Sequence, residues 1–157
     1  MTNNDVIRRI RYIFAISDSA MMNIFSSGGL SVTREEISNW LKADNDPDLV
    51  TCQDVQFATF LNGFINEKRG KKEGPQAIAE KKLNNNLVLT KLKIALNYKA
   101  EDVLEALQLA DFTLGKHELS AFFRKPGHKH YRECKDQILR NFLQGLQIKY
   151  RDNPYSK

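Results

Sequence analysis

The chain contains the same sequence pattern twice, and the two copies lie 82 residues apart without a gap. Residues 3–69 align with residues 85–151, and 11 of these 67 positions are identical. The shared positions include an Asn-Asn pair near the start, a Cys-x-Asp motif and a Phe-Leu-x-Gly motif. Conservative pairs, such as Trp40 with Phe122, lie between the identities. An ungapped match of this length indicates one structural unit that has been duplicated.

The repeat sets the expected domain organisation of the 157-residue chain. We expect a first repeat at 1–70, a linker at 71–84, a second repeat at 85–151 and a C-terminal tail at 152–157. The linker is predicted because its opening sequence, GKKEGP at 70–75, has the composition of an exposed segment. Small domains bury a smaller share of their surface than large ones. We therefore expect the two copies to pack against each other.

Each copy is predicted to be all-α, with four helices. In the first copy, Asn3 and Asn4 are expected to cap the first helix, whose apolar residues recur at helical spacing. A second helix should follow Ser17 and stop at the two glycines 28–29. The second copy repeats the apolar pattern of both helices. No stretch alternates between apolar and polar residues as a half-buried strand would.

Two capping boxes define the remaining helices of the first copy. In such a box, two side chains satisfy free backbone donors at the start of a helix. Thr33 and Glu36 form one box and open the third helix. Thr51 and Asp54 form a second box and open the fourth helix, which should extend to about Arg69. The second and third helices of each copy resemble a helix-turn-helix in outline.

Charged residues on the fourth helices suggest how the two repeats pack. Asp54 and Arg69 are about 22 Å apart along a helix, so they cannot pair within it. If the two fourth helices crossed antiparallel with pseudo-two-fold symmetry, Asp54 would face Arg151 and Asp136 would face Arg69. The alternative is that Asp54 caps its helix and Arg69 is a favourable cation in the last turn. Glycines at the crossing would let the backbones approach. The residues of this packing signature are Asp54, Leu61, Gly63, Arg69, Asp136, Leu143, Gly145 and Arg151.

Charge is distributed unevenly along the chain. Residues 1–70 contain 7 Lys and Arg against 9 Asp and Glu, whereas residues 71–157 contain 17 against 10. The formal net charge of +5 therefore comes from the second half. Two explanations stay open: the second copy has an anionic partner, or the two halves attract each other.

The third helix of the second copy and the loop after it form a candidate nucleic-acid contact. In helix-turn-helix proteins this helix enters the major groove, and basic residues beside it contact phosphates. The candidate residues are Lys116, Arg124, Lys125, Lys129, Arg132 and Lys135. Two features argue against this interpretation: the connection between the two helices exceeds the usual three or four residues, and the first copy is acidic.

No sequence motif for catalysis or cofactor binding is found. The acidic run at 44–48 resembles the start of a calcium loop, but it lacks the glycine and the glutamate that such a loop needs further on. His128, His130 and Cys134 lie close together, but no further ligands for zinc are evident. We therefore expect no metal, no cofactor and no enzymatic activity.

The sequence favours a cytoplasmic protein. No apolar run approaches the ~20 residues that span a bilayer, and the N-terminus lacks the pattern of a secretory signal. Cys52 and Cys134 occupy the same place in each repeat. This placement favours a structural role in a reducing compartment over a disulfide framework.

Three segments carry a resemblance to a known family: NNDVIRRIRY at 3–12, LSAFFRK at 119–125 with a following YRxC motif, and NFLQGL at 141–146. Together they resemble the YehS-like family, bacterial proteins built from two copies of a domain of unknown function. The resemblance extends from Asn3 to about Arg151. It implies a small, duplicated bacterial protein of the cytoplasm, with no assigned activity and no established catalytic residues.

These features favour a small non-enzymatic helical module that acts by interaction or regulation, with a protein partner or self-association. The alternative is a nucleic-acid-binding protein that uses its basic second repeat. Salt-sensitive binding to DNA, abolished by reversing the charges of Arg124, Lys125 and Lys129, would favour the alternative.

Overall fold

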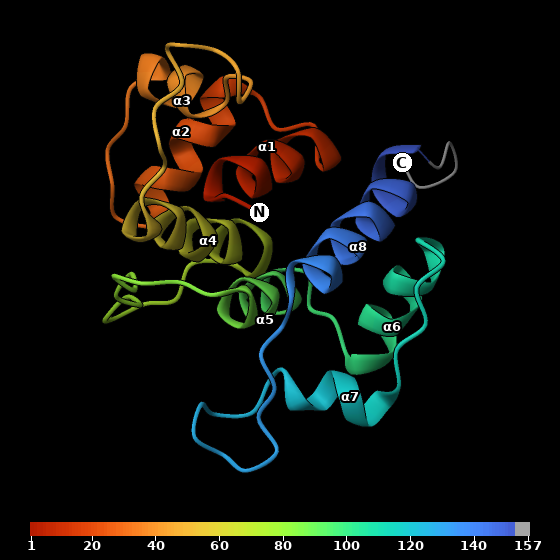
Figure 1. The fold of residues 1–157 in the computed structure, drawn as a ribbon. Helices are drawn as coiled ribbons and strands as arrows, with labels where there is room; N and C mark the ends of the chain where they lie inside the picture. Colours follow the sequence, from red (N-terminus) through yellow and green to blue (C-terminus); the bar gives the residue numbers. More distant parts are fainter. Residues whose placement is uncertain (153–157) are drawn as a thin grey trace. The chain divides into compact units, whose positions relative to one another are not determined.

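The computed structural model describes residues 1–152, and within them it contains eight α-helices, one π-helical segment and no β-strand (Figure 1). The chain divides into two compact units, Met1–Leu83 and Asn84 onward. The all-α fold of two tandem repeats, predicted from the sequence, is confirmed. Among these residues, no helix combines the length and the apolar composition that crossing a bilayer requires.

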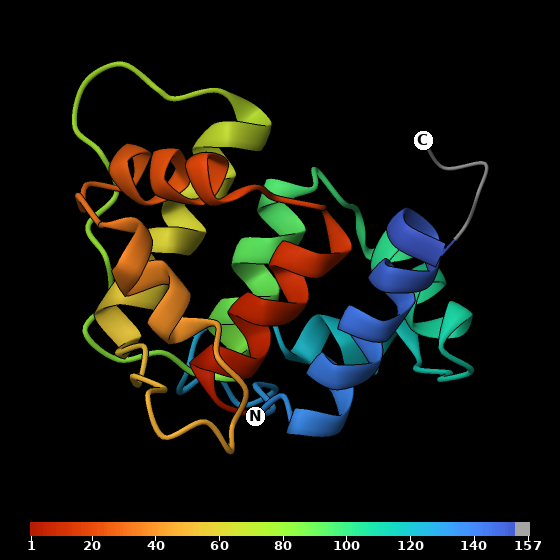
Figure 2. The same ribbon diagram turned by 90° about the horizontal axis from the view of Figure 1, so that it is seen from above.

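The helices of the two units begin at equivalent positions, 82 residues apart. The helices of the first unit are α1 (Asn3–Ile13), α2 (Asp18–Ser27), α3 (Arg34–Trp40) and α4 (Asp54–Arg69). The helices of the second unit are α5 (Asn85–Ala95), α6 (Ala100–Leu109), α7 (Lys116–Ala121) and α8 (Asp136–Gln147). The π-helical segment η1 (Ile148–Asp152) continues α8. In both views the fourth helix of each unit lies beside the second one (Figures 1 and 2).

The start of α1 differs from the prediction. Thr2, not Asn3 or Asn4, is the N-cap: its hydroxyl accepts a hydrogen bond from the Asp5 N–H at 3.0 Å. The Asp5 carboxylate in turn accepts the Thr2 N–H at 2.9 Å, which completes a capping box. The two asparagines are therefore free to bond elsewhere, and the prediction that they cap this helix is wrong.

The other helix starts are partly as predicted. The box between Thr33 and Glu36 is confirmed, with both hydrogen bonds at 3.0–3.1 Å. The box between Thr51 and Asp54 is wrong, because α4 begins at Asp54 and its N-cap is Gln53. The side chain of Gln56 accepts the Gln53 N–H at 2.8 Å instead. The carboxylate of Asp54 is thereby left for other partners.

Two glycines allow the close packing of the second and fourth helices within each unit. A Cβ atom on Gly63 would overlap the carbonyl oxygen of Ile24 in α2. A Cβ atom on Gly145 would overlap the carbonyl oxygen of Ala106 in α6. The sequence predicts that these glycines serve a crossing of α4 with α8. The close approach that the structure shows for them is between helices of the same repeat, and the crossing of α4 with α8 stays a prediction.

The cores of the two units differ in their side chains although their backbones correspond. In the first unit, Phe25 packs against Trp40 and Phe60, with ring centroids 5.2 and 5.3 Å apart. Leu107 replaces Phe25 in the second unit and is fully buried. An aromatic core and a more aliphatic one thus support the same helix arrangement, as expected when total volume and patterning are kept.

Candidate functional site

A buried asparagine holds the loop between α3 and α4 in place. Asn4, 4% exposed, donates through its side-chain amide to the carbonyl oxygens of Trp40 and Val50, at 2.9 and 2.8 Å. Its side-chain oxygen accepts the Cys52 N–H at 3.0 Å. The neighbouring Asn3 donates to the carbonyl oxygen of Cys52 at 3.0 Å. We call this pair the asparagine clamp, because it fixes both ends of the loop to α1.

The second repeat contains the same clamp. Asn86 donates to the carbonyl oxygens of Phe122 and Arg132, at 3.0 and 2.8 Å, and accepts the Cys134 N–H at 2.9 Å. Asn85 donates to the carbonyl oxygen of Cys134 at 3.0 Å. The Asn-Asn pair and the Cys-x-Asp motif of the repeat are thus hydrogen-bonded to each other in both copies. Their equal spacing in the two copies was the signal that could have revealed it from sequence.

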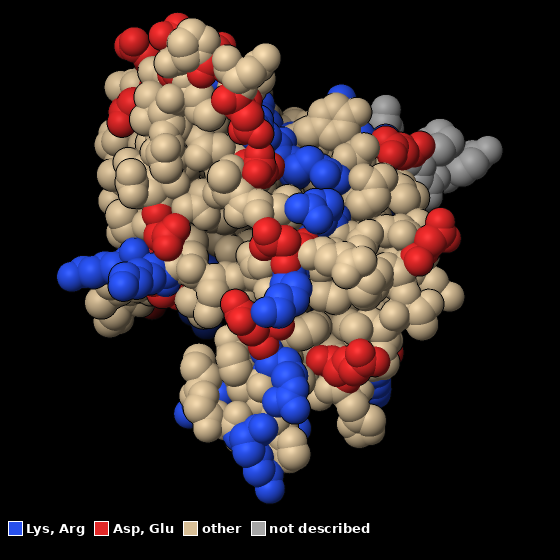
Figure 3. Space-filling model, in the orientation of Figure 1, with Lys and Arg blue, Asp and Glu red and all other residues tan. Residues whose placement is uncertain are grey.

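The loops that the two clamps hold carry opposite charges. Residues 41–53, the acidic loop, contain one lysine and three aspartates, a formal charge of −2. Residues 123–135, the basic loop, contain five Lys and Arg and one Glu, a formal charge of +4. Figure 3 shows acidic side chains over the loop after α3, at the top, and basic side chains over the loop after α7, at the bottom.

The structure places five of the six predicted nucleic-acid contacts on the basic loop. Arg124, Lys125 and Lys129 are exposed there, and none of them forms an ion pair with a residue in 1–152. Arg132 donates to the carbonyl oxygen of its neighbour Tyr131 at 3.0 Å. Lys135 pairs with Glu133 at 3.3 Å. Three cations of the loop are therefore available to an anionic ligand.

The sixth predicted contact, Lys116, is placed differently. It is the first residue of α7 and pairs with Glu101 of α6 at 3.1 Å. The helix itself has only 6 residues and is about 9 Å long. Residues 110–115, which connect it to α6, exceed the usual three- or four-residue turn. The helix pair is present, but the basic loop presents more cations than α7 does.

The cysteines are structural. Cys52 and Cys134 are free and buried, 1% and 2% exposed. Burial raises the pKa of each thiol to about 12, and the carboxylate of Asp54 or Asp136 adds to this shift. The thiols are therefore protonated at neutral pH and are poor nucleophiles and poor metal ligands. No group of three His, Cys, Asp or Glu side chains that could hold a metal ion occurs among the described residues.

The two aspartates of the packing signature contact their own repeats. Asp54 accepts the side-chain amide of Asn3 at 2.8 Å and the N–H of Leu83 at 2.8 Å. Asp136 accepts the side-chain amide of Asn85 at 2.8 Å. Leu61 and Leu143 are core residues, 1% and 0% exposed. Pairing of these aspartates with Arg151 and Arg69 stays a prediction.

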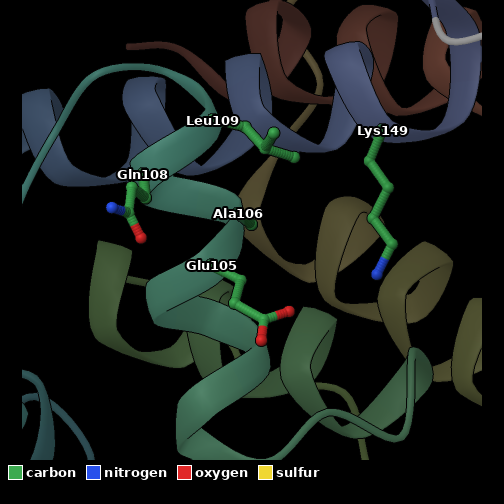
Figure 4. A pocket seen from close by; sticks show the side chains of 5 residues that line it. All are labelled: Glu105, Ala106, Gln108, Leu109 and Lys149. Atoms are coloured by element: carbon green, nitrogen blue, oxygen red, sulfur yellow. The ribbon is translucent and has the colours of Figure 1, made fainter.

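A hollow of about 370 Å³ lies between α6 and η1, and sequence reasoning missed it. Its lining residues are Glu105, Ala106, Gln108, Leu109 and Lys149 (Figure 4). The ammonium group of Lys149 lies 5.0 Å from the ring centre of Tyr98 and 5.4 Å from that of Tyr150. The two tyrosine hydroxyls are hydrogen-bonded at 2.6 Å. Burial, with this hydrogen bond, raises the pKa of Tyr98 well above its ordinary value.

Comparison with known proteins shows the same duplication. The sequence model of a family described as "Protein of unknown function (DUF1456)" matches twice, at residues 3–70 and 85–152. "Uncharacterized protein YehS" of Escherichia coli (strain K12) is 41% identical over 147 residues, which cover 93% of this chain and 94% of the relative. No solved structure matches the chain.

Proposed function

Since this chain belongs to the DUF1456 family, whose function is unknown, we propose a function from the geometry of its surface. The protein is a non-enzymatic interaction module, and its basic loop binds the phosphates of nucleic acid. We also propose that the protein is located in the cytoplasm, in keeping with its two free cysteines.

The observation that carries this proposal is the contrast between two loops on one scaffold. The asparagine clamps are the same, so the backbone ends of the loops are held in the same way. The acidic loop and the basic loop nevertheless differ by six units of formal charge. A structural role alone needs no such difference, because the acidic loop meets the same backbone requirements. The positive charge of the second loop is therefore best explained by a ligand.

The chemistry of the basic loop fits a phosphate backbone. Arg124, Lys125 and Lys129 are exposed, and none of them has an ion-pair partner among residues 1–152. Each Lys or Arg that contacts a phosphate releases condensed counterions from the nucleic acid, which favours binding at low salt. Three such contacts suit a weak, sequence-independent complex, with a Kd of about 10⁻⁴–10⁻⁶ M at physiological salt.

Fluorescence anisotropy with a labelled duplex of mixed sequence tests this function. We expect the logarithm of the binding constant to fall linearly with the logarithm of the salt concentration. Reversing the three charges by Arg124→Glu, Lys125→Glu and Lys129→Glu should abolish binding at a salt concentration of about 100 mM. At lower salt concentrations, where binding by this variant is still measurable, the slope of the logarithmic plot should be smaller in magnitude by about three.

A matched control separates the loop from net charge. Lys71→Glu, Lys72→Glu and Lys82→Glu change three exposed lysines of the linker, and they alter the net charge by the same amount. If the basic loop is the binding site, this variant should keep about half or more of the affinity for DNA. Equal losses in the two variants, or no binding by the unaltered chain, would overturn the proposal and leave a protein partner as the better explanation.

A further inference from the structure

The hollow between α6 and η1 is separate from the basic loop, and the proposed function does not use it. Figure 4 shows Leu109 and Glu105 extending from α6 toward the side on which Lys149 lies, whereas Gln108 points away. Leu109 is 45% exposed, although it is a large apolar side chain. A volume of about 370 Å³ is within the range of small-molecule sites, which starts near 300 Å³.

At the equivalent place, the first repeat has a side-chain hydrogen bond that joins its second and fourth helices. In the first repeat Asn66 of α4 donates to the carbonyl and hydroxyl oxygens of Ser27, both at 3.2 Å, and so ties α4 to the end of α2. The equivalent residues in the second repeat are Ile148 and Leu109, which cannot form this bond. There the helix widens into the π-helical segment η1. Such segments occur often at functional sites.

The hollow presents two opposite charges beside an apolar surface. Lys149 is held over the rings of Tyr98 and Tyr150, a cation–π arrangement that limits the motion of its side chain. Glu105 lies one turn before Leu109, on the same face of α6. No ion pair joins Glu105 to Lys149 in the described residues, so both charges are available to a ligand.

We propose that this hollow binds a small zwitterion with an apolar part, of the class of free amino acids and dipeptides. The ligand carboxylate would meet Lys149, its ammonium group would meet Glu105, and its apolar part would cover Leu109. A phosphate ester fits less well because Glu105 would repel it. A purely apolar ligand fits less well because it would remove both charges from water without pairing them.

Isothermal titration calorimetry on the full chain tests the inference, with L-leucine and leucyl-glycine as probes. We expect binding with a Kd in the millimolar range or tighter, as suits ligands of this size. N-acetyl-leucine lacks the ammonium group and 3-methylbutylamine lacks the carboxylate. Each should bind at least about tenfold more weakly than L-leucine.

Variants that copy the first repeat locate the site. Lys149→Glu and Leu109→Ser introduce the residues found at positions 67 and 27, and each should weaken binding by about tenfold or more. Glu67→Lys makes the opposite change at the equivalent place of the first repeat and should leave binding unchanged. Circular dichroism confirms that each variant is folded. Absence of binding by both probes, or binding that neither Lys149→Glu nor Leu109→Ser alters, would contradict the inference.

Discussion

The acidic and basic loops are held by the same hydrogen bonds and have opposite charges. Asn4 and Asn86 each bond three equivalent backbone groups, one just before the loop and two within it. The clamps depend only on backbone groups of the loop, so they place no condition on most of its side chains. This independence explains how two copies of one unit can keep a common scaffold and differ in the surface that they present.

The largest expected loss of stability comes from the glycines that the two scaffolds share. Gly63→Ala and Gly145→Ala should each lower the free energy of unfolding by about 3 kcal/mol or more, because the new methyl group meets a backbone carbonyl that cannot move aside. Chemical denaturation followed by circular dichroism measures this. Gly115→Ala is the control, since its methyl group meets only the flexible side chain of Glu118. Tolerance of either core substitution would show that the two scaffolds are not equivalent.

The next largest effect should come from the asparagine clamp. Asn4→Ala and Asn86→Ala each remove three hydrogen bonds and leave backbone groups unpaired, so each should cost about 2–3 kcal/mol of unfolding free energy. Asn84→Ala removes only the N-cap of α5 and should cost about 1 kcal/mol. If Asn4→Ala and Asn86→Ala differ widely in the stability that they lose, the two clamps do not hold their loops in the same way.

An exchange of loops should change binding while it changes stability little. A chain with the sequence of residues 41–53 in place of residues 123–135 should unfold within about 1 kcal/mol of the original, because the clamp contacts are to backbone. It should also lose its affinity for DNA. The reverse exchange, which gives the first repeat a basic loop, should increase the affinity. An exchange that leaves DNA binding unaltered would refute the assignment of binding to this loop.

The smallest expected effect is the dependence of stability on high pH. Burial raises the pKa of Cys52 and Cys134 to about 12 in the folded chain, above the ordinary value of 9.0. The unfolded thiols therefore ionise first, and the stabilisation is complete below pH 9 and is lost as the pH rises toward 12. At pH 10 each thiol should account for a loss of about 1 kcal/mol. Cys52→Ala and Cys134→Ala should each reduce this part of the pH dependence, measured by denaturation between pH 8 and pH 10. Equal pH dependence with and without the thiols would contradict the assignment.

The sequence predicted the all-α repeat well because helix periodicity and the 82-residue offset are local or regular signals. The roles of Asn3 and Asn4 were missed because their partners lie 36 to 51 residues away in the chain. The contact of Gly63 with Ile24 was missed for the same reason, since 39 residues separate them in the chain. The basic loop was found because charge is visible in composition. The hollow beside Lys149 was not found, because Glu105 and Lys149, which line it, lie 44 residues apart in the chain.

The widened turn at η1 also limits what sequence alignment can say about the end of the repeat. Arg69 and Arg151 are identical and align without a gap. Arg69 ends a regular α-helix, however, whereas Arg151 lies in a π-helical segment, where each turn contains more residues. Each residue of a π-helical turn rotates the chain by a smaller angle than a residue of an α-helical turn does, so the alignment by itself does not fix the direction of the Arg151 side chain. Sequence identity at this position therefore does not imply spatial equivalence, and a property of one arginine has to be measured separately for the other.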